Sequence, residues 1–243
     1  MAQILQAEWY KLRKSKISWV FVVGPLIALF SGLSATMVIE KYEINEWYLT
    51  LMVMNFTYAL LFLPLLTGVL AGLICRYEHQ AGGWKQLLAT PITRGQIFVA
   101  KYVILMAVIL IIQLIYLVAV FAVGWIKGFS DPFPFAIIWK TILGGWLATF
   151  PLVALQLGLS VMWKSFAAPF AVNVVFTLPN IFAVNSDQFG PYYPWAQPFL
   201  MMYIGGGEGD TFFVPWEQVI TVVGGSLVLF FVAGYMYFLR KPV

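Results

Sequence analysis

Few residues in this sequence could carry out catalysis or hold a metal ion. His79 is the only histidine and Cys75 the only cysteine, which excludes a histidine cluster, a thiolate metal site and a disulfide framework. The phosphate-binding pattern G-x-x-x-x-G-K-[ST] and the nucleophile pattern G-x-S-x-G do not occur. We therefore expect no catalytic residue, metal site or cofactor site in this chain, and by elimination a conduit or a binding module.

The polar residues that could contact a partner gather in residues 76–96, between two strongly apolar stretches. Trp84, Leu87 and Leu88 lie at positions i, i+3 and i+4, which is typical of the apolar face of a short helix. Pro91 ends that helix, because the residue before a proline avoids the helical region. The pattern predicts a short amphipathic helix parallel to the membrane. Its apolar face could rest on lipid, or the helix could dock a soluble partner.

The composition requires a membrane. The chain of 243 residues is 62% hydrophobic and 10% charged, with a mean hydropathy of +0.88, so it has too little polar surface for a water-soluble domain. A membrane-spanning helix needs about 20 predominantly apolar residues, and its backbone must be hydrogen-bonded within the segment. The chain is therefore predicted to be an all-α membrane protein with six transmembrane helices, at approximately 17–39, 50–75, 102–124, 138–162, 166–184 and 218–239.

Lysine and arginine residues set the predicted orientation. With the N- and C-termini both cytoplasmic, only Lys41, Lys127 and Lys140 fall outside, as expected where cytoplasmic loops are rich in basic residues. The net charge of +4 then reflects topology, and we expect a lipid bilayer and no nucleic acid around the chain. Residues 1–16, with apolar residues at helical spacing and a basic end, are predicted to form an amphipathic interfacial helix. The six-helix domain follows at 17–243.

Two stretches depart from regular membrane helices. Pro179-Asn180 lies in the fifth predicted span, where the proline could mark the outer end of the helix or break it beside a cavity. Residues 185–216 are aromatic but interrupted by proline and glycine, which favours one or two short re-entrant or interfacial helices on the outer face. These stretches supply the candidates for a pathway or outer gate, which are Asn173, Pro179, Asn180, Tyr192, Tyr193 and Trp195.

The segment from Glu78 to Leu88, EHQAGGWKQLL, followed by Pro91 and Arg94, resembles the cytoplasmic loop of ABC-2 type transporter permeases. It is most similar to the small permeases of lantibiotic immunity and bacitracin resistance transporters. The start of the chain, EWYKL at residues 8–12, resembles the amphipathic N-terminal helix of the same proteins. The motifs cover about thirty residues, while the layout of spans and the broken aromatic segment agree over the whole chain.

The resemblance implies a function and a set of partners. The chain would be the permease subunit of an exporter in the bacterial plasma membrane, paired with a second permease that is identical or related. Separate ATPase subunits would bind ATP and Mg²⁺ and dock on the cytoplasmic side. In the immunity subgroup the cargo is an amphiphilic antimicrobial peptide, cleared from the membrane to the outside. The residues that the resemblance assigns to the ATPase-coupling interface are Glu8, Lys11, Glu78, His79, Gly82, Trp84, Lys85, Leu87, Leu88, Pro91 and Arg94.

Two other functions remain open from the residues alone. One is a secondary carrier or channel that works without an ATPase, although the inverted repeats and midplane helix breaks usual in carriers are not clear in the sequence. The other is a membrane scaffold or sensor that uses residues 76–96 to dock a soluble partner. Ion-gradient-driven flux without ATPase would favour the carrier.

Overall fold

The computed structural model describes residues 1–14, 19–35, 45–79, 83–88, 91–186, 188–203 and 216–241, and these residues form helices without any strand. The side chains of Leu88 and Trp216 are outside this description. In chain order the helices are α1 (Ala2–Lys14), α2 (Val20–Ser34), α3 (Glu46–Thr57), η3 (Tyr58–Phe62), α4 (Leu63–His79), α5 (Gly83–Leu88), α6 (Arg94–Lys127), α7 (Phe135–Met162), α8 (Ala167–Thr177), α9 (Asn180–Val184), η4 (Gly190–Tyr192), α10 (Gln197–Met202) and α11 (Trp216–Arg240).

Four helices of the described chain are long and apolar enough to cross a membrane: Glu46–His79, Arg94–Lys127, Phe135–Met162 and Glu217–Arg240. They coincide with the second, third, fourth and sixth predicted spans. The first and fifth predicted spans contain the shorter apolar helices α2, of 15 residues, and α8, of 11 residues. At about 1.5 Å per residue, neither covers a hydrocarbon core of about 30 Å by itself. The count of six spans and their orientation therefore stay predictions.

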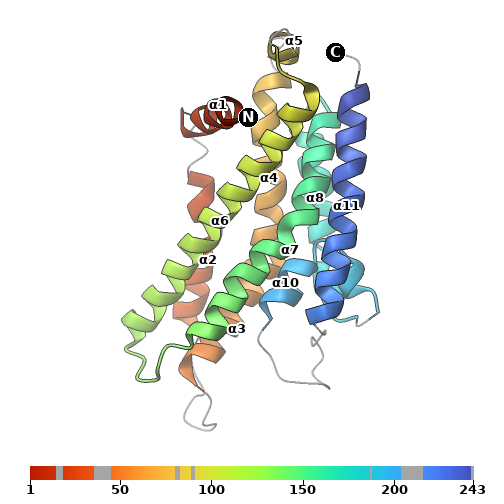
Figure 1. Cartoon of the computed structure of the whole chain (residues 1–243). Coiled ribbons are helices and arrows are strands. Elements are labelled where there is room, and N and C mark those ends of the chain that lie inside the picture. Colours follow the sequence, from red (N-terminus) through yellow and green to blue (C-terminus); the bar gives the residue numbers. More distant parts are fainter. Residues whose placement is uncertain are drawn as a thin grey trace.

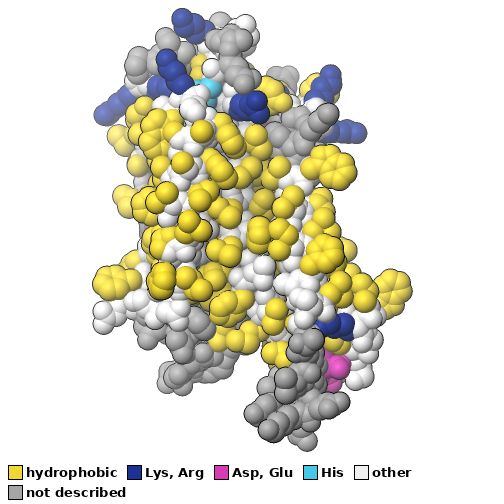
Figure 2. Space-filling model, turned by 180° about the vertical axis from the view of Figure 1, so that it is seen from behind, with side chains coloured by type: hydrophobic (Ala, Val, Ile, Leu, Met, Phe, Trp, Pro, Cys, Tyr) yellow, Lys and Arg dark blue, Asp and Glu magenta, His cyan; other side chains and the backbone are white. Residues whose placement is uncertain are grey.

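The helices form a bundle with distinct ends (Figure 1). The helix α1 lies across one end of the bundle, and α5 and the C-terminal end of α11 lie at that same end. Figure 2 shows that Lys and Arg side chains gather at this end, while apolar side chains cover the flank below them. A polar end next to an apolar flank is the surface expected of a bundle embedded in lipid. We call this end the basic end.

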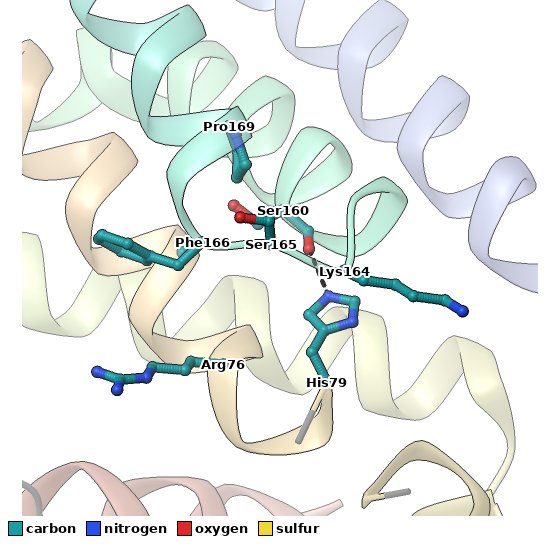
Figure 3. A pocket seen from close by; sticks show the side chains of 8 residues that line it. Arg76, His79, Ser160, Lys164, Ser165, Phe166 and Pro169 are labelled. Atoms are coloured by element: carbon teal, nitrogen blue, oxygen red, sulfur yellow. Dashed lines mark hydrogen bonds between the residues drawn. The ribbon is translucent and has the colours of Figure 1, made fainter. Parts of the chain in front are cut away.

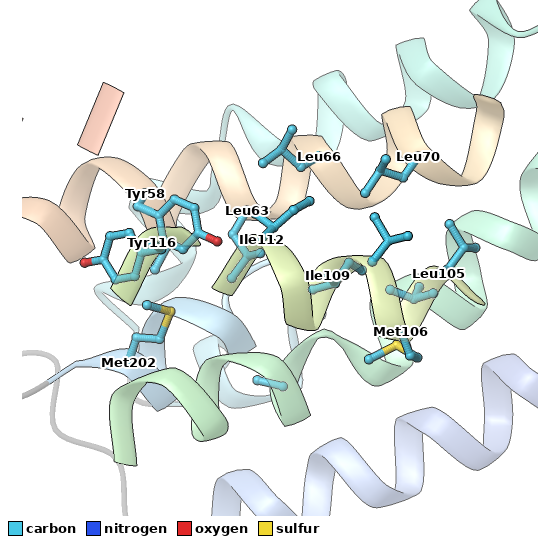
Figure 4. Close-up of a cluster of buried hydrophobic side chains, with 14 of the residues drawn as sticks. Tyr58, Leu63, Leu66, Leu70, Leu105, Met106, Ile109, Ile112, Tyr116 and Met202 are labelled. Atoms are coloured by element: carbon cyan, nitrogen blue, oxygen red, sulfur yellow. The ribbon is translucent and has the colours of Figure 1, made fainter. Parts of the chain in front are cut away.

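The interior is packed with apolar side chains from α4, α6, α7 and α10. Tyr58 of η3 and Tyr116 of α6 stack with ring centroids 4.2 Å apart. Figure 4 shows this pair beside a row of side chains from two facing helices and Met202 of α10. The row repeats at helical spacing on both helices: Leu63, Leu66 and Leu70 on one, and Leu105, Ile109 and Ile112 on the other.

A proline inside the first long helix, Glu46–His79, is accommodated by a distant side chain. Pro64 has no N–H, so it cannot donate the usual helical hydrogen bond to the carbonyl of Leu60. The turn before it is widened into the π-helix η3, and the side-chain amide of Asn180 donates to the Leu60 carbonyl at 2.8 Å. Asn180 thus supplies the hydrogen bond that Pro64 cannot, as membrane helices with proline require.

Pro179 separates two helices. The helix α8 ends at Thr177, and the five-residue helix α9 begins at Asn180, so the predicted span 166–184 is not one continuous helix. Pro179 itself is exposed, whereas Asn180 is fully buried. Of the predicted short helices between residues 185 and 216, the structure describes the turn η4 and α10, and every residue of α10 is buried. Residues 204–215 lie outside the described residues.

Two glycines let α4 and α8 approach closely. A Cβ atom at Gly68 would lie 2.2 Å from Nδ2 of Asn173, and one at Gly72 would lie 2.8 Å from the ring of Phe166. Gly68 and Gly72 are four residues apart, which is the small-x-x-x-small spacing that lets membrane helices pack closely, and here both lie at the contact of α4 with α8.

We predict that Gly68→Ala destabilises the protein, because the added methyl group displaces the buried Asn173. Overpacking of this kind costs about 1–3 kcal/mol. The matched control is Gly225→Ala in α11, where an added Cβ atom would have no described neighbour within 4 Å. Thermal unfolding of the detergent-purified variants measures the effect, and equal midpoints for both variants would contradict the proposed contact.

Candidate functional site

A buried cluster of four charged side chains joins α1, α4 and α6 at the basic end. The ammonium group of Lys101 in α6 lies 2.8 Å from a carboxylate oxygen of Glu8 and 3.0 Å from one of Glu78. Lys11 bridges the same two carboxylates, at 2.7 Å and 2.8 Å. Lys101 also donates to the carbonyl of Ile74 at 3.0 Å. We call Glu8, Lys11, Glu78 and Lys101 the charge cluster.

The charge cluster can hold helices together because most of it is buried. The side chains of Glu8, Glu78 and Lys101 are only 2%, 4% and 1% exposed, while that of Lys11 is 36% exposed. Two carboxylates and two ammonium groups balance one another, so no net charge is left inside. Buried ions are costly to remove from water, and removing one partner leaves the others uncompensated. The charge cluster therefore fixes α1 against α4 and α6 in one arrangement.

Trp84 holds α5 against the bundle. Its side chain is 7% exposed, and its indole N–H donates to Nδ1 of His79 at 3.1 Å. Because Nδ1 accepts this bond, a neutral His79 carries its proton on Nε2, which lies 2.8 Å from the carbonyl oxygen of Ser160. The Trp84 ring also packs on Phe238 of α11, with centroids 5.1 Å apart. One side chain of α5 is thus connected to α4, α7 and α11.

The end of α11 is tied to the neighbouring helices by two basic side chains. The guanidinium group of Arg94, at the start of α6, donates to the carbonyl of Leu239 at 3.2 Å and to that of Lys241. The ammonium group of Lys241 donates to the carbonyl of Val161 at the end of α7. Basic groups are favourable at these positions because the last carbonyls of a helix have no helical partner. Partial burial lowers the pKa of the Lys241 side chain.

Most of the predicted coupling residues lie at the basic end, but some of their side chains are buried and others are exposed. Glu8, Glu78 and Trp84 are buried, so they connect helices and offer little surface to a partner. Lys85 and Pro91 are exposed. The remaining predicted residues are partly exposed or not described: Lys11, His79, Leu87 and Arg94 are partly exposed, Gly82 is outside the described residues, and so is the side chain of Leu88. Lys101 and Lys241 belong to the same assembly and were not among the predicted residues.

The second predicted group, for a pathway or outer gate, is also only partly brought together. The amide nitrogen of Asn173 donates to the carbonyls of Pro64 and Leu65, both at 3.1 Å. Its amide oxygen accepts from Gln156 at 2.9 Å and from the indole N–H of Trp195 at 2.8 Å. These bonds use the full capacity of Asn173. The Asn173 amide is buried and fully hydrogen-bonded in this conformation, so it is not free to bind cargo.

The other members of this group are placed differently. Asn180 shares Trp195 as a neighbour, because it donates to the Trp195 carbonyl at 2.9 Å. The hydroxyl group of Tyr193 donates to the carbonyl of Phe176 at 2.6 Å, and its ring lies 5.4 Å from that of Trp195. Tyr192 is 63% exposed and lies apart from this network. Asn173, Asn180, Tyr193 and Trp195 therefore form one assembly that joins α4, α8, α9 and the segment before α10.

We predict that Lys101→Met destabilises the protein by about 3–5 kcal/mol, because Glu8 and Glu78 then face each other without a buried cation. Lys14→Met, an exposed charge change in α1, is the control and should have little effect. Adding Glu8→Gln and Glu78→Gln to Lys101→Met should recover much of the loss. Thermal unfolding of the four proteins measures this. A triple variant no more stable than Lys101→Met alone would show that charge balance is not the cause.

A family model described as ABC-2 family transporter protein matches residues 4–180. The match begins in α1 and ends at the first residue of α9, so it includes the charge cluster and α5. No curated protein matches the chain.

Proposed function

Because this chain belongs to the ABC-2 family of transporter proteins, we propose that it is the membrane permease subunit of an ATP-driven exporter whose ATPase docks at the basic end. ABC-2 permeases generally work with a separate ABC ATPase, which would bind ATP and Mg²⁺. The observation that carries the proposal is the way in which α1 and α5 are fastened to the bundle. A force applied to these helices would pass to α4, α6, α7 and α11 through the contacts of the charge cluster and of Trp84.

A coupling helix, which transmits movement of the ATPase to the permease, needs one face for each protein, and α5 has two such faces. On the inner face, Trp84 contacts His79 and Phe238. On the opposite face of the helix, Lys85 and Gln86 are exposed. An ATPase that binds this exposed face would displace α5. Trp84 would pass the displacement to the bundle, because its ring packs on Phe238 and its indole is hydrogen-bonded to His79. From His79 the displacement would pass to the end of α7 through the bond to the Ser160 carbonyl.

The charge cluster gives α1 a comparable role. Glu8 and Lys11 of α1 are bound to Glu78 of α4 and Lys101 of α6. Those two helices lie on either side of α5 in the chain. A docking ATPase would therefore encounter α1 and α5 as one connected surface. The charged and polar groups within it fix the geometry, while the exposed residues around it meet the partner.

We propose that the permease works as a pair with a second permease, identical or related. The helix α11 offers a surface for such a pairing. Only 17% of its most apolar 18-residue stretch is buried inside the bundle, against 56–72% for the other three long helices. The exposed apolar side chains along it include Ile220, Val228, Leu229, Val232 and Met236. In a single bundle this face would meet lipid.

We further propose an amphiphilic, antimicrobial-peptide-like cargo that leaves the membrane to the outside, in an immunity or resistance role. The buried polar groups of the bundle centre are amides and hydroxyls, such as Asn55, Gln113 and Tyr116. Beside the buried assembly around Trp195, the ring of Tyr192 is exposed and that of Tyr193 is partly exposed, and such half-polar rings suit a cargo that is half apolar. These features support the proposed cargo class.

Two substitutions in α5 should separate docking from coupling. Trp84→Phe keeps an apolar ring but loses the hydrogen bond to His79, a loss of about 1 kcal/mol. We expect ATPase binding to persist while transport per ATP hydrolysed falls about fivefold. Lys85→Ala should instead weaken ATPase binding. Co-purification of the ATPase, ATP hydrolysis and efflux from vesicles are measured for both, with Lys140→Ala at the opposite end as the control.

Unchanged binding and unchanged coupling in both variants would contradict the docking site. Flux driven by an ion gradient in vesicles that lack an ATPase would contradict the ATP-driven mechanism and support a secondary carrier.

The cargo proposal predicts the phenotype of a deletion. A strain without this chain should become more sensitive to amphiphilic cationic peptides and stay unchanged toward water-soluble antibiotics. The wild-type chain supplied in trans should restore resistance, and Trp84→Phe should restore it less. Growth inhibition across a panel of both classes is the measurement, and an unchanged peptide profile would refute the immunity role.

A further inference from the structure

A pocket opens at the basic end between the ends of α4 and α7 and the start of α8 (Figure 3). Its volume is about 90 Å³, whereas one water molecule needs about 10–15 Å³ on the same measure. Gly72 and Phe166 form part of its apolar wall, and Arg76, Ser160, Lys164 and Ser165 supply polar groups. The pocket is therefore large enough for a polar group of several atoms.

Ser160 marks the polar side of the pocket. Its side chain is 2% exposed, and its hydroxyl oxygen has no hydrogen-bond partner within the described parts of the chain. Buried hydroxyl groups are almost always hydrogen-bonded, so this group calls for a partner that is not part of the protein. Ser165 lies beside it in Figure 3. The Ser165 hydroxyl accepts from the N–H of Ala167, which leaves its own proton free to be donated.

The charged residues of the lining are cationic. Arg76 and Lys164 are exposed, and in Figure 3 their side chains extend outward from the pocket in opposite directions. No carboxylate is among the lining residues that the structure describes. His79 also lines the pocket, but both of its ring nitrogens are engaged, with Trp84 and with the Ser160 carbonyl. The available groups are thus two cations and two hydroxyl donors, a set that suits an oxyanion and not a cation.

We propose that this pocket binds a phosphate-type oxyanion, with the Ser160 and Ser165 hydroxyls donating to its oxygens and Arg76 and Lys164 closing over it. The anion is either the phosphate of a lipid headgroup or free inorganic phosphate. The apolar wall from Gly72 and Phe166 would face the glycerol end of a lipid. The proposal does not depend on transport or on the ATPase, so it can be tested by binding alone.

The test uses the purified full chain in detergent, with inorganic phosphate, dioleoylphosphatidylglycerol and zwitterionic dioleoylphosphatidylcholine as separate probes. The shift of the thermal unfolding midpoint with probe concentration gives the affinity. We expect saturable binding of an anionic probe, about tenfold weaker in an Arg76→Gln, Lys164→Gln double variant. Ser160→Ala, which changes no charge, should weaken it several-fold.

The matched control is Arg13→Gln with Lys14→Gln, which removes two exposed cations that do not line the pocket. Its affinity should stay within about twofold of wild type, since exposed charges outside the pocket are screened by salt. Binding of phosphatidylglycerol alone would identify a lipid site, and binding of inorganic phosphate would identify a free-anion site. Two results would overturn the proposal: no saturable binding of either anion, or equal weakening in both double variants with no effect of Ser160→Ala.

Discussion

The buried ammonium group of Lys101 constrains the whole basic end. An isolated charge in a bundle interior is too costly to keep. Lys101 contacts two carboxylates, each from a different helix, and Lys11 balances the second of them. That requirement brings α1 across the end of the bundle and holds the end of α4 beside α6. It also places the start of α5 close to the same point, because α5 follows α4 after a short connection. The geometry on which coupling would depend thus follows from charge neutrality.

At both the basic end and the bundle centre, side chains donate hydrogen bonds to backbone carbonyls of other helices. At the basic end, side chains satisfy helix-terminal carbonyls, as Arg94 does for Leu239 and Lys241 for Val161. At the centre, Asn180 and Asn173 satisfy carbonyls around Pro64. In both places a polar side chain from a distant part of the chain donates to a backbone carbonyl. Helix ends and helix breaks are therefore the points where separate parts of the chain become dependent on each other.

The sequence predicts the elements better than it predicts their contacts. Apolar length predicts the long helices, and the spacing of Trp84 and Leu87 predicts α5, because both patterns are local. The direction in which Trp84 points is not local. Both sequence interpretations placed its face on lipid or a partner, whereas it packs on His79 and Phe238 inside the bundle. Periodicity identifies an apolar face but cannot identify what covers it.

Lys101 illustrates the same limit for charges. In the sequence it is one of several basic residues that set the orientation, and its partner Glu8 lies 93 positions away. No spacing rule connects two residues so far apart. A lysine several residues inside a helical apolar run is nevertheless unusual enough to demand a counter-charge, and this was the one signal in the sequence that could have drawn attention to it. The pairing itself required the folded structure.

The hydrogen bond between Asn180 and the Leu60 carbonyl has a consequence for how the protein is made. The two residues are 120 positions apart, so the carbonyl freed by Pro64 cannot receive this donor until most of the chain has been synthesised. Until then the first long helix, Glu46–His79, carries an incompletely satisfied backbone within an apolar run, which is unfavourable in contact with lipid. The early helices are thus poorly suited to leaving the insertion machinery one at a time, and release into the bilayer as a group accords better with their chemistry.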